Sequence, residues 1–463
     1  MSPAARNEQS LRGRVPRGQT GPVSAHPPGR VNVRTVLAVG EFRALLASSL
    51  LSVLGDQVAR IAVALLVFSR TGSPFAAAAT YACSLLPWLV AGPLLSALAD
   101  RLPRRRLMVL SDLARAALVA LLLLPGVPLP AVFVVLLLVG LASPAFDAAK
   151  SAVLTEVLPG ESYLVGNALQ NVTVQFAQVT GFLVGGAAVA LTGTNGALAL
   201  DAATFLVSAA LLGTFVQARP LPAREAASLL SDTVAGVTLV AGDPLLRRML
   251  AFGLLAALVT IAPEGLAVPV AAQLGGGPVT AGLLTAALPA GFLLGSVVVL
   301  KVPSGRRPAL LPLLVAFSGV ALLLTPALRA PVAVTALWLL VGAGSAVGLV
   351  ANAAYMQAVP PELRGRAFGV ADTALTAVQG GLLLALGGLA EVLDPRVVVA
   401  GAGGVALLLL LALHPLGRPG RTITRRADEA PGLVGDQALG LAGVPSQPVD
   451  ASLNTPVEPG LRR

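Results

Sequence analysis

Residues 129–146, LPAVFVVLLLVGLASPAF, contain no charged side chain. An α-helix needs about 20 mainly apolar residues to cross the hydrocarbon core of a bilayer, where it must satisfy its own backbone hydrogen bonds. Similar apolar stretches recur from residue 42 to residue 416, separated by short loops that carry Gly, Pro or Arg. The sequence therefore predicts an all-α membrane protein that crosses the bilayer many times.

We predict twelve transmembrane helices in two pseudo-symmetric six-helix halves. Their predicted ranges are 42–69, 74–99, 106–126, 129–156, 163–192, 195–217, 246–273, 277–300, 307–328, 331–357, 365–392 and 397–416. The domains are then a disordered tail over 1–38, a first half over 39–218, a linker over 219–245, a second half over 246–416 and a disordered tail over 417–463. The linker has apolar residues at helical spacing among polar ones, which is typical of an amphipathic helix at a membrane surface.

The composition excludes several classes of protein. Hydrophobic residues make up 56% of the chain and charged residues 12%, against about 25% charged in an average soluble domain. The net charge of +10 comes from Arg residues between apolar stretches, without the basic helix of a nucleic-acid-binding protein. The chain has one cysteine, Cys83. Its two histidines are His26, in the amino-terminal tail, and His414, at the end of the last apolar stretch. We therefore expect neither a disulfide nor a metal site.

The distribution of basic residues predicts the orientation in the membrane. Three loops on one side carry most of them: Arg101, Arg104, Arg105 and Arg106; Lys301, Arg306 and Arg307; Arg364 and Arg366. Loops on the opposite side carry little beyond Arg70, Arg329 and Arg396. Because Lys and Arg accumulate on the cytoplasmic side, we expect a multi-pass protein of the cell membrane with both termini in the cytoplasm.

An internal repeat supports the two halves. Residues 158–161, LPGE, match residues 359–362, VPPE, and the pair Arg105-Arg106 matches Arg306-Arg307 at the same offset of 201 positions. Two loops that agree on one offset indicate two halves in parallel orientation, as in carriers built from six-helix repeats.

The loop between the second and third predicted helices resembles a known family signature. Residues 96–106, SALADRLPRRR, resemble the major facilitator superfamily loop, with Ser96 and Pro103 where glycines are usual. The resemblance implies a cytoplasmic gate in which a carboxylate and guanidinium groups clamp neighbouring helices. The gate residues would be Ser96, Asp100, Arg101, Arg104 and Arg105, and we expect Asp112 and Arg115, one to two turns into the next helix, to complete their network.

Further stretches resemble proton-linked exporters of that superfamily. Residues 181–186, GFLVGG, resemble a Gly-Pro-x-x-Gly-Gly motif with Phe182 in place of Pro. Its glycines, Gly181, Gly185 and Gly186, would pack helices closely, although generic small-residue packing explains them as well. Four other stretches resemble the macrolide efflux and enterobactin exporter branch: 54–57 (LGDQ), 201–209 (DAATFLVSA), 243–248 (DPLLRR) and 361–366 (PELRGR).

Charged residues inside the apolar stretches are candidates for proton coupling, because a charge at that depth is costly unless it is paired or neutralised. Asp56 lies about 22 Å into its predicted helix at 1.5 Å per residue, and Arg60 follows it at i+4. The two could exchange protons or form a fixed ion pair. Glu264 has no charged neighbour within a helical turn and is expected to be neutral part of the time. It is the first candidate for proton coupling.

Other polar residues are candidates for the lining of a cavity. They are Gln170, Asn171, Gln175, Gln178 and Asp201. Hydrogen bonds between helices would explain the amides equally well. Asp147, Lys150 and Asp372 lie near predicted helix ends, and the sequence does not decide whether they have a function.

Together these features predict a secondary active transporter. We expect proton-coupled efflux, by antiport, of drug-like or siderophore-like amphiphilic molecules, with multidrug specificity. A proton-symport importer or a lipid-flipping carrier would share the fold. We do not expect an enzyme, because no Ser/His/Asp constellation is present. No nucleotide-binding loop occurs, so we do not expect ATP to be the direct energy source. The expected partners are the bilayer, a small-molecule substrate and protons, without nucleic acid. We expect a monomer without a cofactor, driven by the proton gradient.

Overall fold

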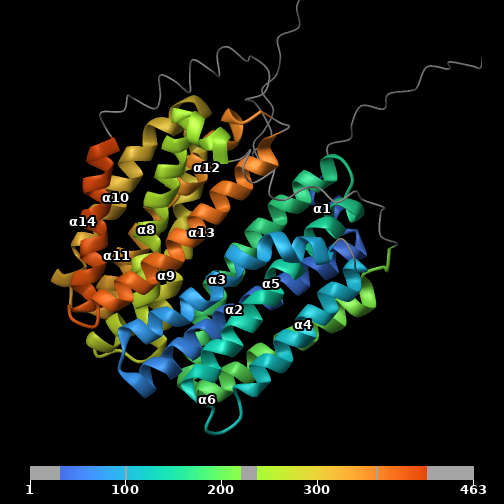
Figure 1. Ribbon diagram of the computed structural model, residues 1–463, viewed down its shortest axis with the longest axis horizontal. Coiled ribbons are helices and arrows are strands. Elements are labelled where there is room, and N and C mark those ends of the chain that lie inside the picture. The colour runs from blue at the N-terminus through green and yellow to red at the C-terminus, as the bar shows by residue number, and fades with distance from the viewer. Residues whose placement is uncertain (1–31, 100–101, 220–236, 361–362, 414–463) are drawn as a thin grey trace, which may run out of the picture.

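The computed structural model describes residues 32–99, 102–219, 237–360 and 363–413, apart from the side chains of residues 89–99 and 366. Every regular element in the described part is helical (Figure 1). Nine of its helical segments are long and apolar enough to cross a membrane. The protein is therefore a multi-pass membrane protein, as predicted.

The helices gather in two groups, blue to green and yellow-green to red in Figure 1. The first group contains α1 (Val33–Leu37), α2 (Gly40–Thr71), α3 (Pro74–Ala99), α4 (Arg104–Leu121), α5 (Leu129–Val157) and α6 (Glu161–Phe215). The second group contains α8 (Pro244–Gln273), α9 (Pro278–Lys301), α10 (Leu311–Leu323), α11 (Pro331–Gly344), α12 (Val347–Ala358), α13 (Arg364–Leu389) and α14 (Pro395–Leu413), with 3₁₀ turns η1 (Ser304–Leu310) and η2 (Thr325–Ala327).

Helix α6 is too long for a single crossing. Its 55 residues would extend about 80 Å at 1.5 Å per residue, against about 30 Å for the hydrocarbon core. Gly193 interrupts it with φ 73° and ψ 179°, a conformation that glycine adopts without steric cost. The chain can therefore reverse at Gly193, between the two predicted helices 163–192 and 195–217.

One prediction needs correction at a helix boundary. Residues 33–37 were expected to lie in a disordered tail but form α1, whose Val36 is 1% exposed and packs in a cluster with Phe42 and Leu154. The predicted helix 331–357 corresponds to one candidate membrane span, Pro331–Ala358, whose regular helix is interrupted at Ser345 and Ala346 between α11 and α12. Most of the predicted linker lies outside the described residues; residues 237–242 of it are helical.

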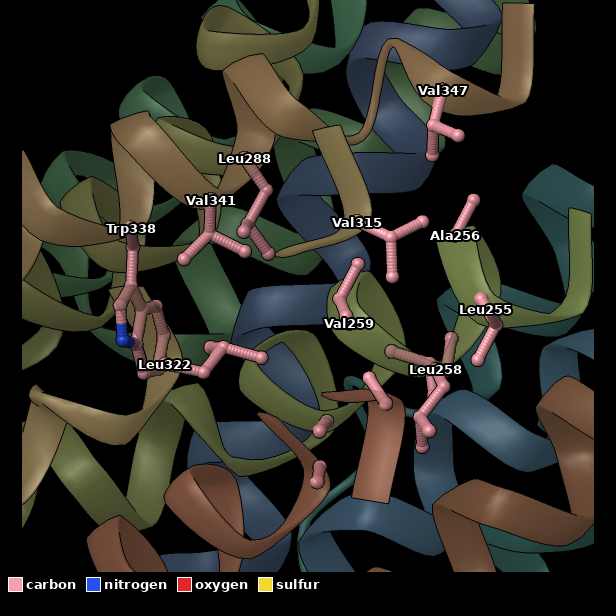
Figure 2. Close-up of a cluster of buried hydrophobic side chains, with 14 of the residues drawn as sticks. Leu255, Ala256, Leu258, Val259, Leu288, Val315, Leu322, Trp338, Val341 and Val347 are labelled. Carbon is pink, nitrogen blue, oxygen red and sulfur yellow. The ribbon is translucent and has the colours of Figure 1, made fainter. Parts of the chain in front are cut away.

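The second group has an extensive apolar core. Helix α8 lies within it, and most of its side chains from Leu255 to Ala271 are buried. Figure 2 shows side chains of α8, α9 and α11 converging, among them Val259, Leu288 and Val341. Trp338 is fully buried there, and its indole N–H donates to Thr325 Oγ1 over 3.4 Å. This core surrounds α8, the helix that carries Glu264.

The two groups meet through α3 against α13 and α6 against α9. Gly186 and Gly282 form one close approach, because a Cβ on Gly186 would lie 3.1 Å from the Gly282 Cα. A Cβ on Gly387 would likewise lie 3.1 Å from the Phe75 Cα. These contacts lie near Gly193 and the α2–α3 loop, at the same end of the first group.

Candidate functional site

Cavities among the described helices include a large one and a small one. The large cavity, of about 340 Å³, is bounded by α6, α8, α9, α12 and α13. Its polar lining residues are Gln175, Gln178, Thr260, Glu264, Thr285, Ser345, Asn352, Tyr355 and Gln379. The small cavity, of about 200 Å³, lies among α2 to α6. Its charged lining residues are Asp56, Arg60, Arg115, Asp147, Lys150 and Asp201. Gln178 lines both cavities, so they are adjacent.

An ion pair joins the two helix groups at this junction. Arg60 Nη1 on α2 lies 3.9 Å from Glu264 Oε1 on α8, and the two side chains are 31% and 24% exposed. The expectation that Glu264 is unpaired is therefore wrong. Its partner comes from a distant part of the chain, and spacing along one helix cannot reveal such a partner.

Asp56 has a different cationic neighbour from the one predicted. Arg115 Nη1 on α4 lies 4.0 Å from Asp56 Oδ2, whereas the ion pair of Arg60 is made with Glu264. The fixed Asp56–Arg60 pair is therefore not the arrangement in this structure. Both side chains nevertheless line the small cavity, which leaves Arg60 between two carboxylates.

Asp112 and Arg115 form a buried junction inside the first group. Arg115 Nη2 donates to Asp112 Oδ1 over 2.6 Å, and Ser208 donates to Asp112 Oδ2 over 2.6 Å. The Arg115 guanidinium carbon lies 4.7 Å from the ring centre of Phe146 and 4.6 Å from that of Phe205. These partners lie on α5 and α6, not in the predicted gate loop, because α4 turns positions 112 and 115 toward the interior.

Only some residues of the predicted gate belong to the described part of the structure. Asp100 and Arg101 lie outside the described residues, and the side chain of Ser96 is not described. Arg104 pairs with Glu156 at the end of α5, and Arg105 donates to the Gly213 carbonyl near the end of α6. The gate itself stays a prediction.

Sequence reasoning missed the charges that surround Arg104. Arg219 Nη2 lies 2.5 Å from Glu41 Oε2, and Arg219 Nε lies 3.7 Å from Glu156 Oε2. We call the part of the first group that contains Glu41, Arg104, Glu156 and Arg219 the Arg-rich end. The sequence feature that could have predicted this network is the presence of acidic residues near basic residues at helix ends.

A second missed contact lies at the opposite end. Glu391, in the α13–α14 loop, accepts hydrogen bonds from the Ser73 hydroxyl and from the Phe75 N–H, the latter over 2.9 Å. A carboxylate at the first turn of α3 satisfies backbone donors and complements the helix dipole. Glu391 therefore ties the second helix group to the start of α3.

Some of the predicted cavity residues line a cavity, and others do not. Gln175 and Gln178 line the large cavity, and Asp201 lines the small one with 1% exposure. Gln170 is instead buried and donates to Ser49 on α2, while Asn171 is exposed. For Gln170, therefore, the alternative of a hydrogen bond between helices describes the geometry.

The charged residues whose function the sequence left open also differ in position. Lys150 Nζ lies 2.7 Å from Asp147 Oδ1 beside the small cavity. Asp372 is exposed on α13 and lines neither cavity. Its position makes it a suitable control for Glu264.

The glycine motif packs α6 against two helices. A Cβ on Gly181 would lie 2.7 Å from the Leu54 carbonyl oxygen, and one on Gly185 would lie 3.0 Å from the Val58 Cα, both on α2. Gly186 faces α9 through Gly282. The three glycines therefore allow close backbone approach, which agrees with either interpretation of the motif.

Gly181→Ala should lower the free energy of unfolding by about 1–3 kcal/mol, because the added methyl group forces α2 and α6 apart. Gly369→Ala is the matched control, since Gly369 is exposed on α13 and a Cβ there meets no atom within 4 Å. Thermal unfolding of the purified protein in detergent measures both. Equal unfolding temperatures of Gly181→Ala and the parent would contradict the close packing.

Comparison with known proteins agrees with this architecture. The family model described as Major Facilitator Superfamily matches residues 45–374. The chain is 28% identical over 351 residues to the uncharacterised MFS-type transporter YfiS of Bacillus subtilis (strain 168), covering 72% of this chain and 82% of YfiS.

Solved structures with a similar fold include two transporters. One is an inward-facing, unoccupied bacterial homologue of the human lysosomal transporter Spinster, with a TM-score of 0.62 and 15% identity over 83% of this chain and 97% of that chain. The other is a POT family transporter in complex with 5-aminolevulinic acid, with a TM-score of 0.67 and 13% identity over 84% of this chain and 100% of that chain. At these identities the similarity shows the fold alone. Since the family model covers well over half of the sequence, the chain belongs to the Major Facilitator Superfamily and is a secondary transporter of that type.

Proposed function

We propose that the protein is a proton-coupled exporter of drug-like amphiphiles in the cell membrane. The observation that carries this proposal is the Arg60–Glu264 ion pair, which joins the two helix groups at the junction of two cavities. Ionisable residues at this depth are costly and mark ion or substrate pathways. The four stretches that resemble macrolide efflux and enterobactin exporters support export as the direction.

The proposed topology has twelve crossings. Gly193 divides α6 into two spans, and α3 and α4 add two more to the nine candidates. Helix α4 carries Asp112 and Arg115, which neutralise each other inside the first group. Under the positive-inside rule the Arg-rich end faces the cytoplasm, together with both tails.

The structure then corresponds to a state closed toward the exterior. The described close contacts between the groups include Gly186–Gly282, Phe75–Gly387 and the hydrogen bonds to Glu391, all at the end opposite the Arg-rich end. A carrier that rocks two halves about a central site must break such contacts to open outward.

Glu264 is the proposed proton-exchanging group. A proton on Glu264 removes its charge and releases Arg60, which loosens the ion pair between α2 and α8. Arg60 then has Asp56 four residues earlier on the same face of α2 as an alternative partner. Proton binding thus changes an interaction between the halves without leaving a guanidinium group unpaired.

Transport in membrane vesicles of opposite orientation tests the direction. Inverted vesicles should take up a fluorescent amphiphile when their interior is acidified, and a protonophore should abolish this uptake. Vesicles from cells that lack the protein are the control. Gradient-driven uptake by right-side-out vesicles instead would show a proton-symport importer and overturn the proposal of export.

A further inference from the structure

The large cavity has an asymmetric charge distribution. Among the described residues that line it, Glu264 is the charged one, and the others are apolar or neutral. Arg60, its partner, lines the small cavity and not the large one. A molecule in the large cavity therefore contacts the Glu264 carboxylate, whereas the Arg60 guanidinium group approaches that carboxylate from the small cavity.

The size and the remaining lining of the large cavity favour an apolar guest. Its volume of about 340 Å³ lies in the range of sites for small organic molecules. Phe182, Phe292 and Tyr355 contribute aromatic rings, which attract cations through their faces and also bury apolar surface. These rings complement a lipophilic molecule that carries a positive charge.

The ion pair at the edge of the cavity is exchangeable. The Arg60–Glu264 distance of 3.9 Å exceeds the 2.7–2.9 Å of a charge-assisted hydrogen bond, so the pair gains mainly from Coulomb attraction. Both side chains are partly exposed. A second cation can therefore compete with Arg60 for Glu264, and the displaced Arg60 has Asp56 on its own helix within reach.

We propose that the large cavity binds lipophilic monocations, whose positive centre replaces Arg60 at Glu264. This inference rests on the proposed function as a carrier and defines its substrate class. Of the two classes that the sequence left open, it selects cationic drug-like molecules over siderophore-like chelators, whose anionic oxygens Glu264 would repel. Arg60 acts in the empty protein as a resident counter-ion, which every substrate must displace.

A pair of isosteric probes tests the charge preference. Tetraphenylphosphonium and tetraphenylborate have nearly the same shape and opposite charges. Binding is measured by equilibrium dialysis on the purified full-length protein in detergent, without any gradient. The parent should bind the cation at least about tenfold more tightly than the anion, and Glu264→Gln should lose about that factor for the cation alone, because the amide carries no net charge to attract it. Glu264→Asp should retain the preference for the cation.

Arg60→Gln tests whether Arg60 competes with the bound cation for Glu264 or forms an ion pair that only supports the structure. Removing the competitor should tighten cation binding several-fold, whereas loss of a merely structural pair would weaken it. Asp372→Asn is the matched control, because it removes an exposed carboxylate on α13 that lines neither cavity. It should leave both affinities unchanged.

Three results would overturn the inference: preference for tetraphenylborate, absence of tetraphenylphosphonium binding to the parent, or weaker cation binding by Arg60→Gln. The first two leave the proposed function standing if vesicles still accumulate a neutral or anionic amphiphile. Cation binding with the expected response to the four variants, but without gradient-driven transport in vesicles, would instead sustain the site and refute the exporter.

Discussion

Arg115→Met should lower the free energy of unfolding by about 3–5 kcal/mol, the largest stability effect that we expect from a single substitution. The side chains of Arg115 and Asp112 are 2% and 0% exposed, and Arg115 Nη2 lies 2.6 Å from Asp112 Oδ1. Methionine is similar in length and apolar, so it preserves much of the packing against Phe146 and Phe205 while leaving Asp112 without its close cation. Chemical unfolding in detergent measures the change.

Arg396→Met is the matched control for this prediction. Arg396 Nη2 lies 3.2 Å from Asp394 Oδ2, and the two side chains are 21% and 38% exposed, so the change should stay below about 1 kcal/mol. Asp112→Asn combined with Arg115→Met should restore part of the lost stability, because it removes the fully buried carboxylate that Arg115 neutralises; the second carboxylate near Arg115, Asp56, is 30% exposed. An Arg115→Met protein as stable as the parent would contradict the assignment of this pair as a buried junction.

Glu264→Gln should reduce proton-driven accumulation of substrate at least about tenfold while the protein still folds, since the amide cannot release a proton and no longer holds Arg60 by charge. The structural cost should be small, because Arg60 is 31% exposed and Asp56 lies four residues away on the same helix face. Accumulation in inverted vesicles and thermal unfolding of the purified variant measure the two effects separately.

Asp372→Asn controls for the loss of a carboxylate from the second helix group, and it should accumulate substrate as the parent does. Accumulation by Glu264→Gln at the parental level would pass the coupling role to Asp56. Asp56→Asn should then show the defect. It should also fold normally, because Arg60 and Arg115 retain Glu264 and Asp112 as partners.

Much of the helical architecture could be predicted because bilayer-spanning segments are long and apolar. The predicted helix 74–99 has the bounds of α3, and 129–156 ends one residue before α5 does. Hydropathy does not predict where local geometry interrupts an apolar helix. Residues 331–358 form one candidate membrane span, as predicted, but Ser345 and Ala346 interrupt the regular helix between α11 and α12 although both sides are apolar.

The candidate site could be predicted only residue by residue. Asp56, Arg60 and Glu264 stood out because charges are rare in apolar segments. Their partners could not be assigned, because periodicity relates residues of one helix, whereas Arg60 meets Glu264 from another helix group. Glu391 escaped notice for the opposite reason: a carboxylate in a loop is ordinary, and its hydrogen bond to the start of α3 depends on packing between the groups.

Proton movement coupled to substrate movement tests the central claim most directly. The purified protein is reconstituted in vesicles with an acidic interior, and a pH-sensitive dye inside reports the pH when an amphiphile without a titratable proton is added outside. We expect the interior pH to rise as substrate enters, and the rise to be absent with Glu264→Gln. Substrate accumulation without a change of pH, or an equal change with Glu264→Gln, would contradict proton-coupled export through the Arg60–Glu264 pair.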